Sequence, residues 1–387
     1  GVLLIHISGF YWAQPAKDPS LGHLLTFTVT NEAVRFALFG FMFISGLLLT
    51  VRHGGNFHAG PFLAKRVRTI LVPYLAWVVL YFLLSAHSNS LVVTQLSKAA
   101  HGSFNHIKIV ASWVLFGTWQ HLYFINMLFQ MYLLYTIFQR PLSAILARKQ
   151  AAIALVLCLL LLYPLWVYFR FMPYRHPGVA LPHVFVWMTK NANRLAFEWL
   201  VPFTFGLAVG AYYTQFLAWV HRYRTVLTVV TLAALGVTVT IAATPWITAH
   251  RTADMVNYGW PYSYLHPLFR LVYAFGFNCL IITAAANLLQ RFDAAQLRWL
   301  PLTQRFAAVS FGVYLFHPVV LDVLRRLHFP GSAHGISYSV YNHSAYLYLL
   351  FTTIVVTGIS FFVVDGMSRL GKRHHSLQWL YTTLFGR

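Results

Sequence analysis

The stretch FMFISGLLLTVRHGGNFHAGPFLAKRVRTILVPYLAW, residues 41–77, contains the pattern that decides the fold. An uncharged apolar segment over residues 36–50 ends in a short connection rich in basic residues and glycine. A second apolar segment begins directly after that connection. Two apolar helices joined by a cationic connection are typical of a transmembrane pair whose connection lies at the membrane surface. Such a connection also suits the binding of a large anion.

The composition of the whole chain favours a membrane protein. Hydrophobic residues make up 59% of the 387 residues and charged residues only 9%, whereas about 25% of the residues in a soluble domain are charged. We therefore predict an all-α, polytopic integral membrane protein, with about ten transmembrane helices in one bundle. We expect a single domain over residues 1–387.

The expected spans are apolar runs, and no soluble domain interrupts them. They cover residues 1–12, 33–51, 69–86, 120–138, 150–169, 199–215, 225–244, 268–289, 306–326 and 345–365. The first is expected to be the remainder of a longer helix, because the chain opens on an apolar run without an initiator methionine.

The net charge is +21, from 28 Lys and Arg against 7 Asp and Glu. A nucleic-acid-binding protein would need a soluble basic face, but here the basic residues lie in short loops between apolar segments. That placement indicates topology signals, so we expect no nucleic-acid partner. The charge bias predicts a multi-pass protein of the cell membrane with both termini in the cytoplasm.

Three histidines lie within the expected spans, where polar groups are costly and are candidates for function. His6 is either a packing residue bonded to a carbonyl or a general base that takes a proton from a hydroxyl. His317 precedes Pro318, which frees a backbone carbonyl, so this histidine either stabilises a kink or lies beside a cavity. His121 begins a polar stripe with Asn126 and Gln130 that either bonds neighbouring helices or lines a polar substrate site.

Two acidic residues, Glu32 and Glu198, stand out because the chain has only seven. Each has an arginine close in sequence, Arg35 for the first and Arg194 for the second. These residues are either neutralised ion pairs or part of a substrate site in the outer half of the bundle.

The basic connection holds Lys65 and Arg68, which share a helical face, and Arg66, which points elsewhere. Either these side chains anchor the inner membrane surface, or they bind phosphate groups, which guanidinium groups contact bidentately. The sequence contains no glycine-rich nucleotide loop, zinc motif or nucleophile elbow. We therefore expect no metal, and catalysis would have to depend on histidine.

Five segments, taken together, carry a family resemblance. They are the first helix with His6, FMFISGLLL at 41–49, FLAKRVRTILVPYLAW at 62–77, HLYFINMLFQMYLLY at 121–135 and SFGVYLFHP at 310–318. In this order the chain resembles the membrane-bound acyltransferase 3 family.

The resemblance implies a ten-helix enzyme of the lipid bilayer that takes an acyl group, commonly acetyl, from cytoplasmic acyl-CoA to an extracytoplasmic glycan or glycolipid. His6 matches the family histidine, whose arginine partner would precede Gly1. Arg66 and Arg68, with Lys65 beside them, match the basic pair thought to bind acyl-CoA. The remaining polar candidates would contact the acceptor: His121, His317, Glu32, Arg35 and Glu198.

Two other functions stay open at this point. A polysaccharide exporter would show internal repeats and paired broken helices, and the sequence has no convincing repeat. A catalytically inactive scaffold of a synthesis complex is the third possibility. Binding of acyl-CoA followed by the product mass would separate the three.

Overall fold

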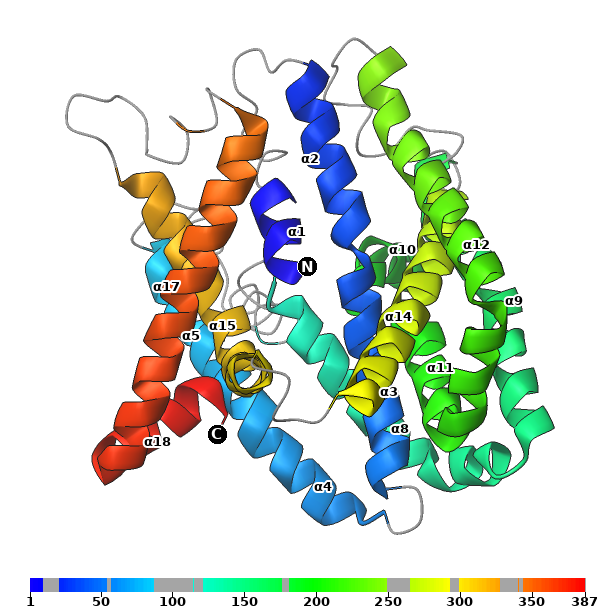
Figure 1. Cartoon of the computed structure of the whole chain (residues 1–387), viewed down its shortest axis with the longest axis horizontal. Coiled ribbons are helices and arrows are strands. Elements are labelled where there is room, and N and C mark those ends of the chain that lie inside the picture. The colour runs from blue at the N-terminus through cyan, green and yellow to red at the C-terminus, as the bar shows by residue number, and fades with distance from the viewer. Residues whose placement is uncertain are drawn as a thin grey trace.

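A computed structural model describes residues 1–9, 21–53, 57–86, 114, 121–175, 181–248, 265–292, 299–327, 340 and 344–386. Every regular element in these ranges is a helix, which confirms the all-α prediction (Figure 1). In chain order they are α1 (Val2–Gly9), α2 (Leu21–Val34), α3 (Phe36–His53), α4 (Ala59–Arg66), the π-helix η2 (Val67–Leu71), α5 (Val72–Ala86), α8 (Tyr123–Leu146), α9 (Lys149–Arg175), α10 (His183–Lys190), the 3-10 helices η3 (Ala192–Arg194) and η4 (Ala196–Trp199), α11 (Leu200–Ala211), α12 (Tyr213–Thr248), α14 (Leu265–Arg291), α15 (Leu300–Arg326), α17 (Ala345–Arg373) and α18 (His375–Phe385).

Seven helical stretches in the described ranges are long and apolar enough to cross a membrane, fewer than the ten predicted. They are Leu21–His53, Ala59–Leu84, Lys149–Met172, Tyr213–Thr244, Leu265–Arg291, Leu300–Leu324 and Ala345–Arg373. The other three expected spans correspond to α1, α8 and α11. Helix α11 has only 12 residues, and α1 has 8, with residues 10–12 of that expected span outside the described ranges. Helix α8 has 24 residues, but its polar stripe lowers its mean hydropathy below that of the seven candidate spans.

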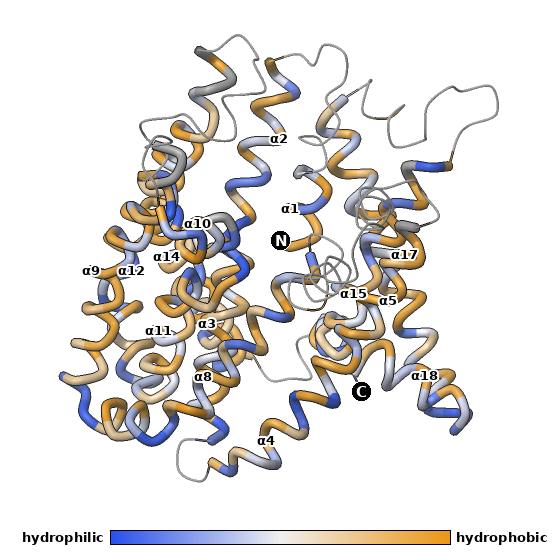
Figure 2. Tube along the Cα trace, turned by 180° about the vertical axis from the view of Figure 1, so that it is seen from behind, coloured by the Kyte–Doolittle hydropathy of each residue, from blue (hydrophilic) through white to orange (hydrophobic). Residues whose placement is uncertain are grey.

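The outer surface of the bundle is apolar, as a lipid environment requires. Leu161, Ile137 and Phe362 are each at least 70% exposed, whereas soluble proteins rarely expose large apolar patches. Figure 2 shows hydrophobic residues along most of the helices and hydrophilic stretches at α4, at α18 and where α9 begins. This surface is therefore suited to contact with the hydrocarbon interior of a membrane.

Helices α3 and α11 pack with their backbones almost in contact. A Cβ atom built on Gly206 would lie 2.0 Å from the carbonyl oxygen of Phe43, and one on Gly46 would lie 2.2 Å from that of Phe203. Gly206 and Gly210 form a small-xxx-small pattern, which allows this close approach between membrane helices. This contact fixes α3, the first half of the stretch that defines the fold.

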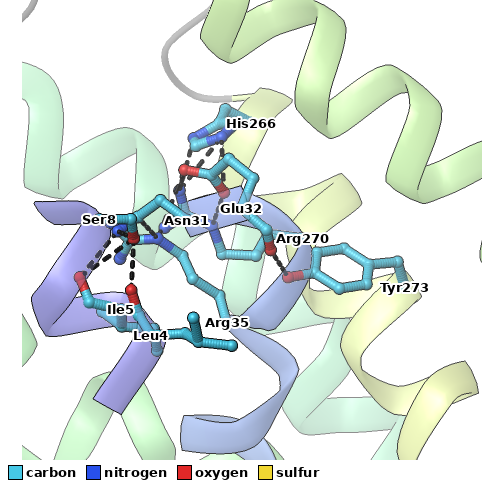
Figure 3. Close-up of polar contacts among 9 residues, drawn as sticks. All are labelled: Leu4, Ile5, Ser8, Asn31, Glu32, Arg35, His266, Arg270 and Tyr273. Atoms are coloured by element: carbon cyan, nitrogen blue, oxygen red, sulfur yellow. Dashed lines mark hydrogen bonds and ion pairs between the residues drawn. The ribbon is translucent and has the colours of Figure 1, made fainter. Parts of the chain in front are cut away.

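Helix α1, which carries His6, is enclosed by α2, α15 and α17. It is attached to α2 by one amide side chain: Asn31 Nδ2 donates to the carbonyl of Ile5 at 3.0 Å and to Ser8 Oγ at 2.9 Å. Ser8 Oγ donates to the carbonyl of Leu4 at 2.5 Å. Figure 3 shows these contacts. A buried amide that satisfies a second helix in this way fixes the position of α1 along α2.

The residue after Asn31 is the centre of a buried ion network (Figure 3). Glu32 is 6% exposed, and Arg270 of α14 contacts it bidentately, Nε to Oε2 at 3.0 Å and Nη2 to Oε1 at 2.9 Å. The expected pair with Arg35 is present at 3.4 Å, but it is longer than the contact with Arg270. His266 Nε2 lies 3.4 Å from Oε2, and the Tyr273 hydroxyl donates to the Glu32 carbonyl. The network therefore joins α2 to α14 at the junction of α2 and α3.

Removing the charge of Glu32 should destabilise the fold. In Glu32→Gln the guanidinium groups of Arg35 and Arg270 lose their anionic partner within the bundle, and an uncompensated buried charge costs about 3 kcal/mol or more. We expect purified protein in detergent to lose its monodisperse form at a lower temperature than the wild type.

The control is Asp322→Asn, the same change in an ion pair at the helix surface. Asp322 Oδ2 lies 2.8 Å from Arg326 Nε, with half of the arginine side chain exposed, and such pairs contribute about 0–1 kcal/mol. Equal stability losses in the two variants would contradict the prediction.

Candidate active site

Three histidines that are far apart in the sequence meet inside the bundle. The ring centroid of His6 lies 6.0 Å from that of His121 and 5.3 Å from that of His317. The rings of His121 and His317 are 5.5 Å apart. His121 is 2% exposed and His317 is 0% exposed, and His6 is half-buried. We call these three residues the imidazole cluster.

The imidazole cluster is assembled by three elements: α1, the turn before α8, and α15. The Tyr314 hydroxyl of α15 donates to the carbonyl of His121, which attaches the start of α8 to α15. Tyr81 of α5 adds a wall, because its ring centroid is 5.1 Å from that of His121. Its hydroxyl donates to the carbonyl of Leu315 at 2.7 Å. The cluster is thus surrounded by aromatic side chains and helix backbone.

The orientation of His317 follows from the residue after it. Pro318 lies inside α15 and has no N–H, so it cannot bond the carbonyl of Tyr314, four residues earlier. That carbonyl instead lies 2.7 Å from Nδ1 of His317. The freed carbonyl was predicted from the His-Pro dipeptide, and the structure shows which group takes it.

Two other ring nitrogens of the cluster have no such partner. Nε2 of His121 and Nε2 of His317 are buried and have no hydrogen-bond partner among the described residues. Buried polar atoms without partners are rare in native structures and call for an explanation. In the described part of the chain, no group of His, Cys, Asp or Glu has the geometry of a metal site.

Several residues of this site carried no signal in the sequence. Tyr81 and Tyr314 are two of 22 tyrosines, and nothing in their spacing predicts that they contact His121. Asn31 is a polar residue next to Glu32, and its contact with α1 spans 26 positions along the chain. Only the packing of helices identifies these residues as parts of the site.

The basic connection places its three candidates differently. Lys65 and Arg68 are exposed, whereas Arg66 is partly buried, which agrees with the predicted sharing of a face. The Arg66 guanidinium carbon lies 5.0 Å from the ring centre of Phe62 and 4.7 Å from that of Tyr132. Arg66 Nε has no hydrogen-bond partner among the described residues. Cation–π contacts therefore hold this guanidinium between α4 and α8, with its buried Nε unpaired.

A π-helix separates Arg66 from α5. The amide of Val72 bonds to the carbonyl of Val67, five residues back, and Pro73 follows, which cannot bond the carbonyl of Thr69. A Cβ on Gly386 would lie 2.0 Å from that carbonyl oxygen, and Gly386 has a φ of 76°. Only glycine fits there, so the end of α18 packs closely on the wider turn.

Glu198 lies in a second network and has two hydrogen-bond partners on another helix. Its Oε1 accepts from Arg170 Nη1 at 2.8 Å, and its Oε2 accepts from Trp166 Nε1 at 2.8 Å. Both partners belong to α9. Gln130 of the polar stripe makes two hydrogen bonds to the backbone. Its Nε2 donates to the carbonyl of Arg194 at 3.0 Å, and its Oε1 accepts from the amide of Ala196 at 3.2 Å. The stripe therefore joins α8 to the η3–η4 segment.

The structure thus brings together His6, His121 and His317, and it places Glu32 with Arg35 in a separate network beside α1. Glu198 belongs to a third group, on α9 and η4. Lys65, Arg66 and Arg68 lie on α4 and η2, which Figure 1 shows at one edge of the bundle, while α1 lies further in.

Comparison with known proteins gives a family for this arrangement. Searches of curated protein sequences and of solved structures found no match. A family model described as an acyltransferase domain matches residues 1–364, nearly the whole chain. All residues of the imidazole cluster and of the basic connection fall within that match. With a helical bundle of apolar spans around them, this chain belongs to the acyltransferase 3 family of membrane acyltransferases.

Proposed function

We propose that the protein moves an acyl group from cytoplasmic acyl-CoA to a hydroxyl of an extracytoplasmic glycan or glycolipid. The acyl group is acetyl, and His6 is the general base. The chain belongs to an acyltransferase family, which supports transfer of an acyl group. The observation that carries the finer proposal is the imidazole cluster, a set of proton-accepting groups enclosed by aromatic side chains and helix backbone.

The chemistry needs a group that takes a proton from the acceptor hydroxyl as its oxygen attacks the thioester carbonyl. The carbon–oxygen bond forms, the carbon–sulfur bond breaks, and CoA leaves as a thiolate. Histidine suits this task because its ordinary pKa lies near neutral pH. His6 is the member of the cluster that is half-buried, and so the one with remaining accessible surface.

The donor end of the proposal is the basic connection. Acyl-CoA carries phosphates, and Arg66 and Arg68, with Lys65, offer cationic donors on one short segment. Arg66 is held against two aromatic rings, which supports a guanidinium group fixed in position for a phosphate oxygen. In our proposal this end faces the cytoplasm, together with both termini, and the membrane is the cell membrane.

For the acceptor site we propose His121 and His317 of the cluster, the pair Glu32 and Arg35 beside α1, and Glu198 further along. Glu32 and Arg35 adjoin Asn31, which holds α1. The network around Glu32 contains two arginines, Arg35 and Arg270, and one carboxylate. Its excess positive charge would attract the hydroxyl-rich or acidic groups of a glycan.

Loss of the His6 imidazole should abolish transfer and leave the fold intact. General-base catalysis contributes about 10²–10⁴-fold, so His6→Ala should lower the rate of acyl transfer by about that factor. The measurement is transfer of labelled acetyl from acetyl-CoA to isolated surface glycan by protein in lipid nanodiscs.

The control is His221→Ala, because His221 is exposed on α12 and has no role in the proposal. It should keep the wild-type rate. Undiminished transfer by His6→Ala would remove His6 from the mechanism.

Arg68→Ala should weaken the binding of acyl-CoA without slowing transfer at saturation. One charge-assisted hydrogen bond contributes about 1.5–3 kcal/mol, so KM for acyl-CoA should rise about tenfold or more. Arg68 is the cleaner choice because it is exposed, whereas Arg66→Ala would also remove ring contacts that hold α4.

Arg373→Ala, a change at the exposed C-terminal end of α17, serves as the matched control and should leave KM unchanged. If Arg68→Ala raised KM for the glycan and not for acyl-CoA, the proposed donor site would be wrong. A wild-type protein that moves glycan across the membrane unmodified, without acyl-CoA, would instead be an exporter.

A further inference from the structure

The imidazole cluster contains a second proton acceptor whose state is fixed by the backbone. Nδ1 of His317 lies 2.7 Å from the carbonyl oxygen of Tyr314. A carbonyl oxygen only accepts hydrogen bonds, so Nδ1 has to carry the proton. In the neutral ring the other nitrogen, Nε2, then has a free lone pair.

In a buried histidine, this second nitrogen would ordinarily have a hydrogen-bond partner. The His317 side chain is fully buried, and Nε2 has no hydrogen-bond partner among the described residues. The His6 ring is 5.3 Å away between centroids, tilted by 38°, and one hydroxyl group can bridge two rings at this separation. The open acceptor therefore adjoins the proposed base.

We propose that His317 is the second base of the reaction, which receives the proton that His6 takes from the acceptor hydroxyl. This inference rests on the proposed function and adds a role for a specific atom. As the acceptor oxygen bonds to the acyl carbon and the carbon–sulfur bond breaks, the proton passes from the hydroxyl to His6 and on to Nε2 of His317. The CoA thiolate finally takes up that proton, so no net charge stays in the bundle.

The backbone supports this role in the way that a carboxylate supports a catalytic histidine. The Tyr314 carbonyl orients the ring and accepts a hydrogen bond that strengthens when His317 becomes positively charged. Pro318 makes the arrangement possible, because any other residue there would offer an amide to the same carbonyl. A histidine that only stabilised the kink would need Nδ1 alone, and would leave no reason for a buried Nε2 without a partner.

The test separates the two nitrogens. In His317→Asn the amide can replace the Nδ1 donor to the Tyr314 carbonyl, but no proton acceptor remains at the position of Nε2. We expect this variant to bind acetyl-CoA with the wild-type Kd and to transfer acetyl about 10²–10⁴-fold more slowly. We also expect the pH profile of kcat to lose one ionisation. His221→Asn, the same change on the exposed face of α12, should change neither.

A structural role predicts a different result. If His317→Asn, which keeps the bond to the kink, transferred acetyl at the wild-type rate with an unchanged pH profile, the inference would be overturned. Wild-type protein without any acetyl transfer, or His6→Ala with full transfer, would overturn the proposed function instead, so the two failures can be told apart.

Two further measurements keep the inference testable if His317→Asn does not fold. Nitrogen NMR of histidine-labelled wild-type protein should show His317 protonated at Nδ1 and unprotonated at Nε2; the opposite tautomer would overturn the inference. Pro318→Ala keeps His317 but returns an amide to the Tyr314 carbonyl. It should lower kcat and leave KM for acetyl-CoA unchanged, and an unchanged kcat would contradict the proposed role of that carbonyl.

Discussion

Polar groups inside a hydrocarbon solvent have to find their partners within the protein, and this constraint explains most of the structure. Glu32 is contacted by Arg35, Arg270 and His266. Threonines along α12 return their hydroxyls to carbonyls four residues back, as Thr228 and Thr238 do. These bonds let polar residues remain in long membrane helices without interrupting them.

The same constraint makes the exceptions informative. The imidazole cluster has two buried nitrogens without partners, one on His121 and one on His317, in a bundle where other polar groups such as Asn31 and Glu198 are well satisfied. A buried polar atom without a partner costs free energy. Most of the other unpartnered atoms in the described ranges are single hydroxyls, such as those of Thr28 and Thr283, whereas the two nitrogens belong to rings that contact each other. This grouping of titratable rings is what supports our proposal that the chemistry takes place at the cluster.

Two prolines show how the backbone is adapted at the two ends of the proposed reaction. Pro318 releases the carbonyl that orients His317. Pro73 follows the π-helix after Arg66, and the carbonyl of Thr69 that it cannot bond lies against Gly386. In each case a proline leaves a carbonyl without its usual amide, and another residue lies close to that carbonyl: His317 bonds one, and Gly386 packs against the other.

Much of this could be predicted from the sequence, because some properties depend on composition and local order. The apolar runs determined an all-α membrane protein, since only helices can satisfy their own backbone over such lengths in lipid. The histidines in those runs, the basic connection and the His-Pro dipeptide were identified as candidates for the same reason. In the described part of the chain, seven helical stretches rather than ten are long and apolar enough to span a membrane. There α1 and α11 are short, and the polar stripe lowers the hydropathy of α8.

Only the tertiary structure decided which candidates meet. His6, His121 and His317 are separated by more than a hundred residues each, and helix packing brings their rings within 6.0 Å. The main partner of Glu32, Arg270, is 238 residues away along the chain, whereas the sequence suggested its neighbour. Local spacing fixes contacts within a helix, but contacts between helices depend on which faces pack together, and that is determined by the bundle as a whole.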